Sequence, residues 1–408
     1  MSSVLRPETA DQILEAVAWA AAAETPLEIV AGGTKRGIGR PLQVEHTLDV
    51  SGLVGITLYE PDELVLSARA GTPMTMIDAA LAAEGQALAF EPPDLGPVLG
   101  GTAGGATIGG VLAANLGGPR RIKMGAARDH FLGLSAVSGR GEAFKSGGRV
   151  VKNVTGYDLC KVLAGSWGTL AVMTDVTIKV LPAPETEVTL VLDGLDARRG
   201  VAALCAAMGS DCEVSAAAFL PPETAAAIAA GAAFDGTGSA ALLRLDGFAP
   251  SVAYRSGRLA AALGDYGAAR QLEADRSRAV WRAVRDLEPF VGSMRPLWKV
   301  SVAPTRGPDV LEAVAAAHPV RALLDWSGGL VWIEVDGGET AEAAIRGAVA
   351  RAGGGHATLV RAEMPVRAAT AVFQPQEPAL AGLSARLKEA FDPRGILNPG
   401  RMYPGAAA

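Results

Sequence analysis

The chain has 408 residues, 49% hydrophobic and 20% charged, which is the composition of a globular protein long enough for two or three domains. Its formal net charge of −6 argues against nucleic acid as a partner. The sequence has no apolar stretch that could span a bilayer and no signal-peptide pattern, so it favours a cytoplasmic protein without a transmembrane segment. The three cysteines, Cys160, Cys205 and Cys212, fit a reducing compartment and cannot supply four ligands to an iron–sulfur cluster; no metal site is predicted.

The first hundred residues predict a mixture of helices and short strands. Residues 8–24 have helical periodicity with an acidic start, and 26–34 (PLEIVAGGT) are typical of a buried strand that ends in a glycine turn. Three β-branched runs at 46–53, 56–62 and 63–73 are separated by turn residues. Residues 74–86 predict a helix that ends at Gly85.

Residues 100–121 (GGTAGGATIGGVLAANLGGPRR) hold too much glycine for an expected helix or buried strand. Such a run predicts positive φ angles or another group pressed against the backbone. Arg120, Arg121 and Lys123 are expected on a solvated loop, with a partner surface as the alternative. A hairpin is predicted over 131–148 and a long strand over 170–182, and the prolines of LPAPETE (181–187) suggest a domain boundary.

The second half predicts strands that alternate with helices. Strands are expected at 188–194, 241–248, 298–305, 321–326 and 330–338, and helices at 250–264, 308–318 and 340–353. Short alternating strands favour an antiparallel sheet backed by helices. The chain closes with a helix from 378 and a turn rich in proline and glycine.

The glycine loops do not match the common phosphate-binding motifs. Gly104 and Gly109 have the P-loop spacing, but Gly110 and Val111 stand where lysine and serine or threonine are needed, and no G-x-G-x-x-G occurs. A second glycine loop, AGGTKRGIG, lies at 31–39. Two such loops can converge on one pyrophosphate through backbone N–H groups. The alternative is that both are ordinary tight turns.

Four segments together resemble a known family. In their order along the chain, they resemble the FAD-binding domain of the vanillyl-alcohol oxidase (PCMH) type. The segments are AGGTKRGIG, PPDLGPVLGGTAGGATIGGVLAANLGG, MGAARDHFLGLSAVSGRGE and VVKNVTGYDLCKVLAGSWGTLAVMTDVTIKVLP. ILNPGRMYP (396–404) is similar to the C-terminal tail of the D-2-hydroxy-acid dehydrogenase branch. The length and the GYDL and GSWGTL segments are most similar to the smaller FAD-binding subunits of bacterial glycolate oxidases.

The resemblance implies an α+β fold with a two-subdomain FAD-binding domain and an α+β cap domain whose sheet is mostly antiparallel. The implied domains are 1–182 for FAD binding, with subdomains of about 1–55 and 56–182, 183–370 for the cap, and 371–408 for a segment that returns to the FAD domain.

The resemblance also implies a set of FAD-binding residues. Those expected at the pyrophosphate are Gly32, Gly33, Thr34 and Lys35, and those expected at the edge of the flavin pocket are Pro93 and Asp94. The diphosphate and ribityl chain would be lined by Thr107, Gly109, Gly110 and Asn115. Contacts further along the cofactor would come from Trp167, Gly168 and Val172, with Val172 at the adenine end and Asn398 at the isoalloxazine ring. Asp158 has a competing interpretation as the cap of the next helix.

The family's catalytic motifs are missing from the sequence. The first glycine loop has no histidine, so the FAD is expected to be non-covalent, with Cys160 as the nearest alternative attachment point. Hydroxy-acid oxidising members carry histidine motifs in the cap and near the C-terminus, whereas here Glu363 lacks a following histidine and His130 is interpreted as structural. Oxidation of an α-hydroxy acid needs a base within hydrogen-bond reach, and the sequence identifies none.

Three functions therefore remain open at this point. The first is an FAD-binding subunit of a multi-subunit glycolate (D-2-hydroxy acid) oxidase or dehydrogenase in glycolate catabolism. Its partners would be a homologous catalytic flavoprotein and an iron–sulfur subunit, and any peripheral contact with a membrane would be made through that complex. The second is a self-sufficient FAD oxidoreductase of another alcohol or hydroxy acid, and the third is a non-catalytic scaffold subunit.

Overall fold

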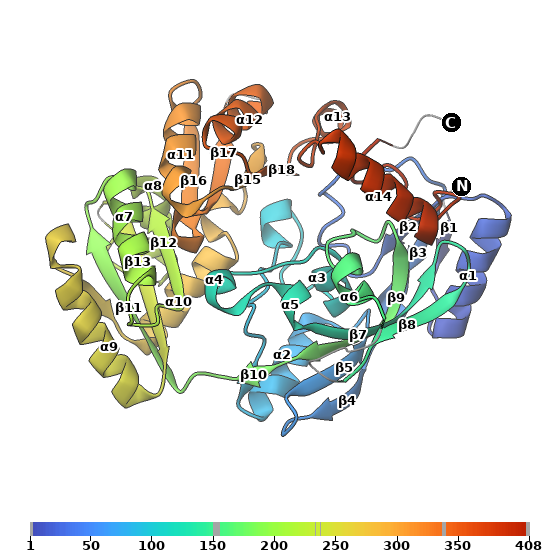
Figure 1. The fold of residues 1–408 in the computed structure, drawn as a ribbon, viewed down its shortest axis with the longest axis horizontal. Helices are drawn as coiled ribbons and strands as arrows, with labels where there is room; N and C mark the ends of the chain where they lie inside the picture. Colours follow the sequence, from blue (N-terminus) through green and yellow to red (C-terminus); the bar gives the residue numbers. More distant parts are fainter. Residues whose placement is uncertain (1–2, 150–155, 233, 237, 337–339, 405–408) are drawn as a thin grey trace.

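The computed structural model describes residues 3–149, 156–232, 234–236, 238–336 and 340–404. For description we divide it into an N-terminal region (up to 182), a middle region (183–370) and a C-terminal tail (371–404). Figure 1 shows the N-terminal and middle regions side by side, with the tail and its helix α14 (Pro378–Phe391) packed back on the N-terminal region. Within these described residues, no helix combines the length and apolar character needed to span a membrane.

The N-terminal region begins with a three-stranded parallel sheet in the order β1 (Ser3–Leu5), β3 (His46–Asp49), β2 (Leu27–Val30). Helix α1 (Ala10–Ala22) starts at Thr9, whose side chain accepts a hydrogen bond from the backbone of Gln12, and this confirms the predicted helix. The C-terminal tail joins the β2 side of this sheet, where the N–H of Leu27 donates to the carbonyl of Ile396 at 2.8 Å. The first and last parts of the chain thus share one core.

A five-stranded antiparallel sheet forms the rest of the N-terminal region. Its order is β4 (Ile56–Glu60), β5 (Val65–Arg69), β9 (Ala171–Lys179), β7 (Phe131–Ser138), β8 (Ala143–Gly147). The predicted hairpin corresponds to β7 and β8, and the predicted long strand to β9. Smaller elements are the pair β6 (Gln86–Ala87) and β10 (Leu181–Pro182) and helices α2 (Met74–Ala83), α4 (Arg121–Met124), α5 (Ala127–His130) and α6 (Leu159–Leu163).

The glycine run contains a helix, contrary to the prediction. Residues Ile108–Ala113 form α3, and the hydroxyl of Thr107 accepts from the N–H of Gly110 at 3.4 Å. The N–H of Gly109 donates to the carbonyl of Ala70 at 2.8 Å, and a Cβ at position 109 would lie 2.7 Å from that oxygen. Glycine is therefore tolerated in this helix because close packing on the segment at Ala70 offsets its low helix propensity.

The middle region is built on an eight-stranded sheet. All of its recorded strand pairings are antiparallel, as predicted. The order is β14 (Arg270–Leu272), β11 (Thr186–Asp193), β13 (Ala240–Gly247), β12 (Ala216–Leu220), β16 (Val320–Asp325), β17 (Leu330–Val335), β15 (Leu297–Ser301), β18 (His356–Arg361). The helices are α7 (Ala197–Met208), α8 (Pro222–Ala232), α9 (Ala249–Ala262), α10 (Ala274–Arg285), α11 (Gly307–Ala315), α12 (Glu342–Arg351) and α13 (Met364–Ala369). Strands β12, β14 and β18 were not predicted.

The basic run after the glycines joins the two regions, and this corrects the prediction of a solvated loop. Arg120 is buried and forms an ion pair with Asp246 at 3.0 Å across the boundary. The guanidinium of Arg121 stacks on the indole of Trp326, 4.7 Å from the ring centroid. Lys123 is exposed, as predicted. Contacts with the middle region thus bury Arg120 and partly shield Arg121 from solvent.

Candidate cofactor-binding site

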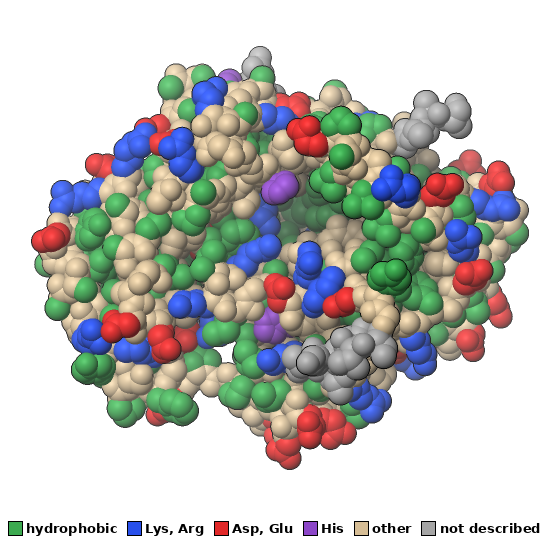
Figure 2. Space-filling model, viewed as in Figure 1, with side chains coloured by type: hydrophobic (Ala, Val, Ile, Leu, Met, Phe, Trp, Pro, Cys, Tyr) green, Lys and Arg blue, Asp and Glu red, His purple; other side chains and the backbone are tan. Residues whose placement is uncertain are grey.

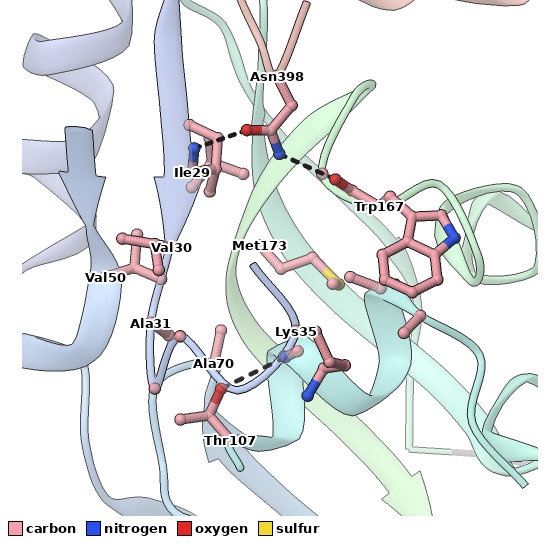
Figure 3. Close-up of a pocket in the computed structure, with 18 of the residues that line it drawn as sticks. Ile29, Val30, Ala31, Lys35, Val50, Ala70, Thr107, Trp167, Met173 and Asn398 are labelled. Carbon is pink, nitrogen blue, oxygen red and sulfur yellow. Dashed lines mark hydrogen bonds between the residues drawn. The ribbon is translucent and has the colours of Figure 1, made fainter. Parts of the chain in front are cut away.

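A cleft lies between strand β2, helix α3, strand β9 and the C-terminal tail (Figure 3). It brings together most of the residues predicted to bind the cofactor: Gly32, Gly33, Thr34, Lys35, Thr107, Gly109, Gly110, Trp167, Gly168, Val172 and Asn398. Lining residues that were not predicted include Ile29, Val50, Ala70, Met173 and Arg401.

The two glycine loops pack directly against each other at this cleft. A Cβ at Gly32 would lie only 1.7 Å from the carbonyl oxygen of Gly105, and Gly33 has a positive φ of 70°. At Gly105, a Cβ would lie 3.1 Å from the side chain of Thr34. The glycines thus allow the two loops to pack closely against each other. Because the loops meet here, the backbone of both faces the same cleft.

Two cationic side chains at the cleft form no ion pair with a carboxylate among the described residues. Lys35 is 9% exposed, and its ammonium donates to the hydroxyl of Thr34 at 3.0 Å. Burial lowers the pKa of Lys35 to about 8, and the nearby Asp94 opposes this shift. Arg401 donates to the carbonyl of Lys35 at 2.9 Å, while its buried Nε has no hydrogen-bond partner in the part of the chain that the structure describes. Buried cations of this kind favour an anionic ligand.

Asn398 connects three segments at the other end of the cleft. Its Oδ1 accepts from the N–H of Ile29 at 2.8 Å, and its Nδ2 donates to the carbonyl of Trp167 at 2.9 Å (Figure 3). The residue is 1% exposed and adopts a left-handed φ of 42°. A Cβ at Gly168 would lie 2.8 Å from Nδ2. Asn398 therefore attaches the C-terminal tail to both walls of the cleft.

Three of the predicted residues lie outside this cleft. Pro93 and Asp94 line a second cavity between the N-terminal region and helix α10. The Asp94 carboxylate accepts from the N–H groups of Gly96 at 3.0 Å and Gly104 at 2.7 Å, so it holds the loop that precedes α3. Asn115 has a left-handed φ of 47°, and its side chain accepts from the N–H of Arg128 at 3.0 Å. Their place in the structure indicates that they shape the loops around the cleft.

The contacts of Asp158, His130 and Cys160 give each of them a structural role. Asp158 caps α6 and accepts from the N–H of Lys161 at 3.3 Å, as its alternative interpretation predicted. His130 is buried and its Nε2 lies 2.8 Å from the carbonyl of Met124. Cys160 is fully buried, and burial raises the pKa of its thiol to about 11. The VVKNVT part of the quoted motif, at 150–155, lies outside the described residues.

Arg401 is the functional candidate that the sequence interpretation left out. It follows Asn398 by three residues in ILNPGRM, and its guanidinium lies 5.6 Å from the ring centroid of Trp167. A basic residue directly after a motif that returns to the cleft was the available signal. Arg401 is a candidate because it is buried, and its burial depends on the packing of the C-terminal tail beside β2.

Comparison with known proteins adds the family. Residues 1–147 match the family "FAD binding domain", and residues 369–402 match "FAD linked oxidases, C-terminal domain". Glycolate oxidase subunit GlcE of Escherichia coli is 36% identical over 394 residues, which cover 96% of this chain and 96% of that protein. The chain belongs to the GlcE family of FAD-linked oxidoreductases. Glycolate oxidase subunit GlcD of Bacillus subtilis is 38% identical over 133 residues, which cover 33% of this chain and 27% of that protein.

Solved structures confirm the PCMH-type α+β fold. p-Cresol methylhydroxylase superimposes with a TM-score of 0.72 at 15% identity, over 98% of this chain and 88% of that chain. Alkyldihydroxyacetonephosphate synthase superimposes with a TM-score of 0.69, also at 15% identity, over 97% of this chain and 75% of that chain. At this identity the likeness establishes the fold alone.

The residues of the cleft fit FAD, the cofactor of this family. The orphaned Nε of Arg401 and the buried ammonium of Lys35 are suited to the two negative charges of a pyrophosphate. Apolar side chains, among them Val50, Val172 and Met173, line the rest of the cleft and suit ring systems. The predicted cofactor, FAD, is thereby supported by family and by chemistry.

Proposed function

We propose that the chain is the FAD-binding subunit of a multi-subunit glycolate oxidase, acting on small D-2-hydroxy acids. The observation that carries the proposal is the 36% identity to GlcE over 96% of both chains. The finer parts of the proposal are a homologous catalytic flavoprotein subunit and an iron–sulfur subunit as partners. A cytoplasmic location, with membrane contact made through those partners, also belongs to the proposal.

Within this function the chain's own residues hold and orient the cofactor. When bound, FAD supplies an acceptor and donor of electrons. Lys35 and Arg401 offer positive charge to the pyrophosphate, and the loops at Gly32 and Thr107 offer backbone to it. Asn398 fixes the tail against β2 and the Trp167 loop. We keep as part of the proposal the domain limits 1–182, 183–370 and 371–408.

The missing histidine motifs bear on how this subunit takes part in the reaction. Among the residues that the structure describes, the cleft is lined by no histidine, cysteine, tyrosine, aspartate or glutamate, and the buried amine of Lys35 is assigned to the pyrophosphate, so no further side chain of the lining is a candidate base for the α-hydroxyl group. A subunit that only transfers electrons within a complex needs an FAD site but no base for the substrate. A self-sufficient oxidoreductase and a scaffold without redox function are the competing outcomes of the experiment.

The experiment is co-purification of a tagged chain followed by steady-state dye reduction with glycolate and with D-lactate. We expect the isolated chain to be yellow and inactive, and the assembled complex to turn over glycolate. A chain that elutes alone and oxidises glycolate unaided contradicts the proposal and favours the stand-alone enzyme.

A second arm separates electron transfer from a structural role. The complex is assembled with a Gly110→Val subunit that has lost FAD, and its activity is compared with that of the parent complex. Loss of activity in an intact complex supports electron transfer through this subunit. Full activity indicates that the subunit and its flavin are architectural.

A further inference from the structure

The middle region contacts one segment of the N-terminal region at several points. This segment, 91–120, holds most of the glycine run and the helix α3 that lines the FAD cleft. Hydrogen bonds and ion pairs across the boundary occur near both of its ends and within it: Glu91–Arg244 at 2.8 Å, Val98–Arg361 at 2.8 Å, Gly118–Trp326 at 3.0 Å and Arg120–Asp246 at 3.0 Å. Figure 2 shows side chains of the two regions in contact below a hollow between the middle region and the tail.

A further contact reaches the loop that precedes α3. Asp286, at the C-terminal end of α10, accepts a hydrogen bond from the N–H of Asp94 at 2.9 Å. The guanidinium of Arg285 donates to both oxygens of the Asp286 carboxylate, at 2.9 and 2.7 Å, and so fixes the direction of this acceptor. The carboxylate of Asp94 in turn accepts from the N–H of Gly104 at 2.7 Å. A chain of hydrogen bonds therefore runs from α10 to Gly104.

Gly104 lies beside the point where the two glycine loops meet. The residue after it, Gly105, is packed so closely on the first loop that a Cβ at Gly32 would lie 1.7 Å from its carbonyl oxygen. A Cβ at Gly105 would lie 3.1 Å from the side chain of Thr34. Gly32 and Thr34 line the FAD cleft. Because the loops are in direct contact, a displacement of Gly104 would also move the backbone expected at the pyrophosphate.

We propose that Asp286 is a positioning residue for FAD, which holds the glycine run in place from the middle region by way of Asp94. Neither carboxylate lines the FAD cleft, so both act on the cofactor through the loop. Linkage requires the reverse effect as well, so bound FAD should strengthen the contact between Asp286 and Asp94. The inference goes beyond the proposed function and needs only FAD binding, so it can be tested without glycolate oxidation.

The test is fluorimetric titration of the full chain with FAD. Asp286→Ala should weaken FAD binding by about tenfold, because the loop loses a hydrogen bond to a charged acceptor. Asp286→Asn keeps an oxygen that can accept from the N–H of Asp94, and its FAD affinity should stay within about threefold of the parent value. Both variants remove the charge that pairs with Arg285, so the difference between them isolates the hydrogen bond to Asp94.

Asp275→Ala is the matched control, because Asp275 is an exposed residue of α10 that pairs with Arg278 of the same helix. Its FAD affinity should equal that of the parent. A second comparison places Asp286→Ala in an Asp94→Ala background, where the connection to Gly104 is already broken. There it should change FAD affinity by less than about twofold, since two residues of one network are not additive.

Hydrogen exchange of peptides within 91–107 reports on the loop directly. Exchange should slow when FAD binds to the parent, and should be faster in Asp286→Ala than in Asp275→Ala. Far-ultraviolet circular dichroism establishes that each variant is folded. Three results overturn the proposal: an unchanged FAD affinity in Asp286→Ala, a loss that Asp286→Asn shows equally, or a loss that persists in full in the Asp94→Ala background. The last result is what a general loss of stability would give.

Discussion

The positive charges buried at the N-terminal cleft are compensated differently from that of Arg361 in the middle region. In the middle region, Arg361 is 5% exposed and is paired with the buried carboxylate of Glu334. In the N-terminal cleft, Lys35 and Arg401 are similarly buried, but no carboxylate contacts either side chain as an ion pair among the described residues. Paired charges support the fold, whereas unpaired ones mark the place of an anionic ligand. The following predictions test this comparison.

The largest expected effect is on stability, at the paired charge. Glu334→Ala should lower the free energy of unfolding by about 3–5 kcal/mol, because it leaves the Arg361 guanidinium buried without its counter-charge. The backbone carbonyls of Val98, Phe290 and Arg295 would remain as its acceptors. Denaturant unfolding of the FAD-loaded protein measures the change. Asp275→Ala, which removes the exposed partner of Arg278, is the control and should cost less than about 0.5 kcal/mol. A loss below about 1 kcal/mol for Glu334→Ala would contradict the comparison.

The next effect is on the cofactor, at the glycine helix. Gly110→Val should reduce FAD affinity by about a hundredfold while stability changes by less than about 1 kcal/mol. Gly110 lies within α3, so the positive φ expected for this residue does not apply. Its Cβ would lie 3.5 Å from the ammonium of Lys35, where the added methyl groups compete with the pyrophosphate. Fluorimetric FAD titration and thermal unfolding provide the two values.

Gly264→Ala is the matched control in the middle region. A Cβ there has no neighbouring atom within 4 Å, and Leu263 is the residue that caps α9. Both FAD affinity and stability should stay near the parent values. Equal flavin content in Gly110→Val and Gly264→Ala would refute the assignment of the glycine helix to the pyrophosphate.

A smaller, pH-dependent effect is expected at Lys35. The pKa of Lys35 is lowered to about 8 in the free cleft, and a bound pyrophosphate should raise it. Binding then takes up a proton above pH 8, so FAD affinity should fall as the pH rises from 8 to 10. Lys35→Met should weaken FAD binding about tenfold at pH 7 and abolish this pH dependence. An affinity that stays constant, or that rises with pH in the parent, would exclude Lys35 as the cationic contact.

The smallest expected effect is at Cys160. This thiol belongs to the hydrophobic core and does not line the cleft, and its raised pKa of about 11 leaves it protonated and a weak nucleophile at neutral pH. Cys160→Ala should leave flavin content unchanged, and acid precipitation of the parent should give a colourless pellet and a yellow supernatant. Flavin retained on the denatured chain would show a covalent link.

Local sequence signals predicted much of the fold. The β7–β8 hairpin and strand β9 follow from alternation and turn residues, and α1 follows from its periodicity and acidic start. Strand β12, with three alanines in five residues, was missed because its burial comes from neighbouring strands on both sides. Helix α3 was missed because glycine is a poor helix former unless a close contact requires it.

The sequence by itself determined the family motifs, the two glycine loops, the absence of a histidine near them and the antiparallel character of the second sheet. Only the tertiary structure decided which polar groups lose water. Lys35 and Arg401 are 366 residues apart and become one buried cationic pair when the tail joins β2. Arg120 is buried and Arg121 half-buried because Asp246 and Trp326 of the middle region pack against them. Burial depends on contacts between distant segments, and no local pattern encodes these contacts.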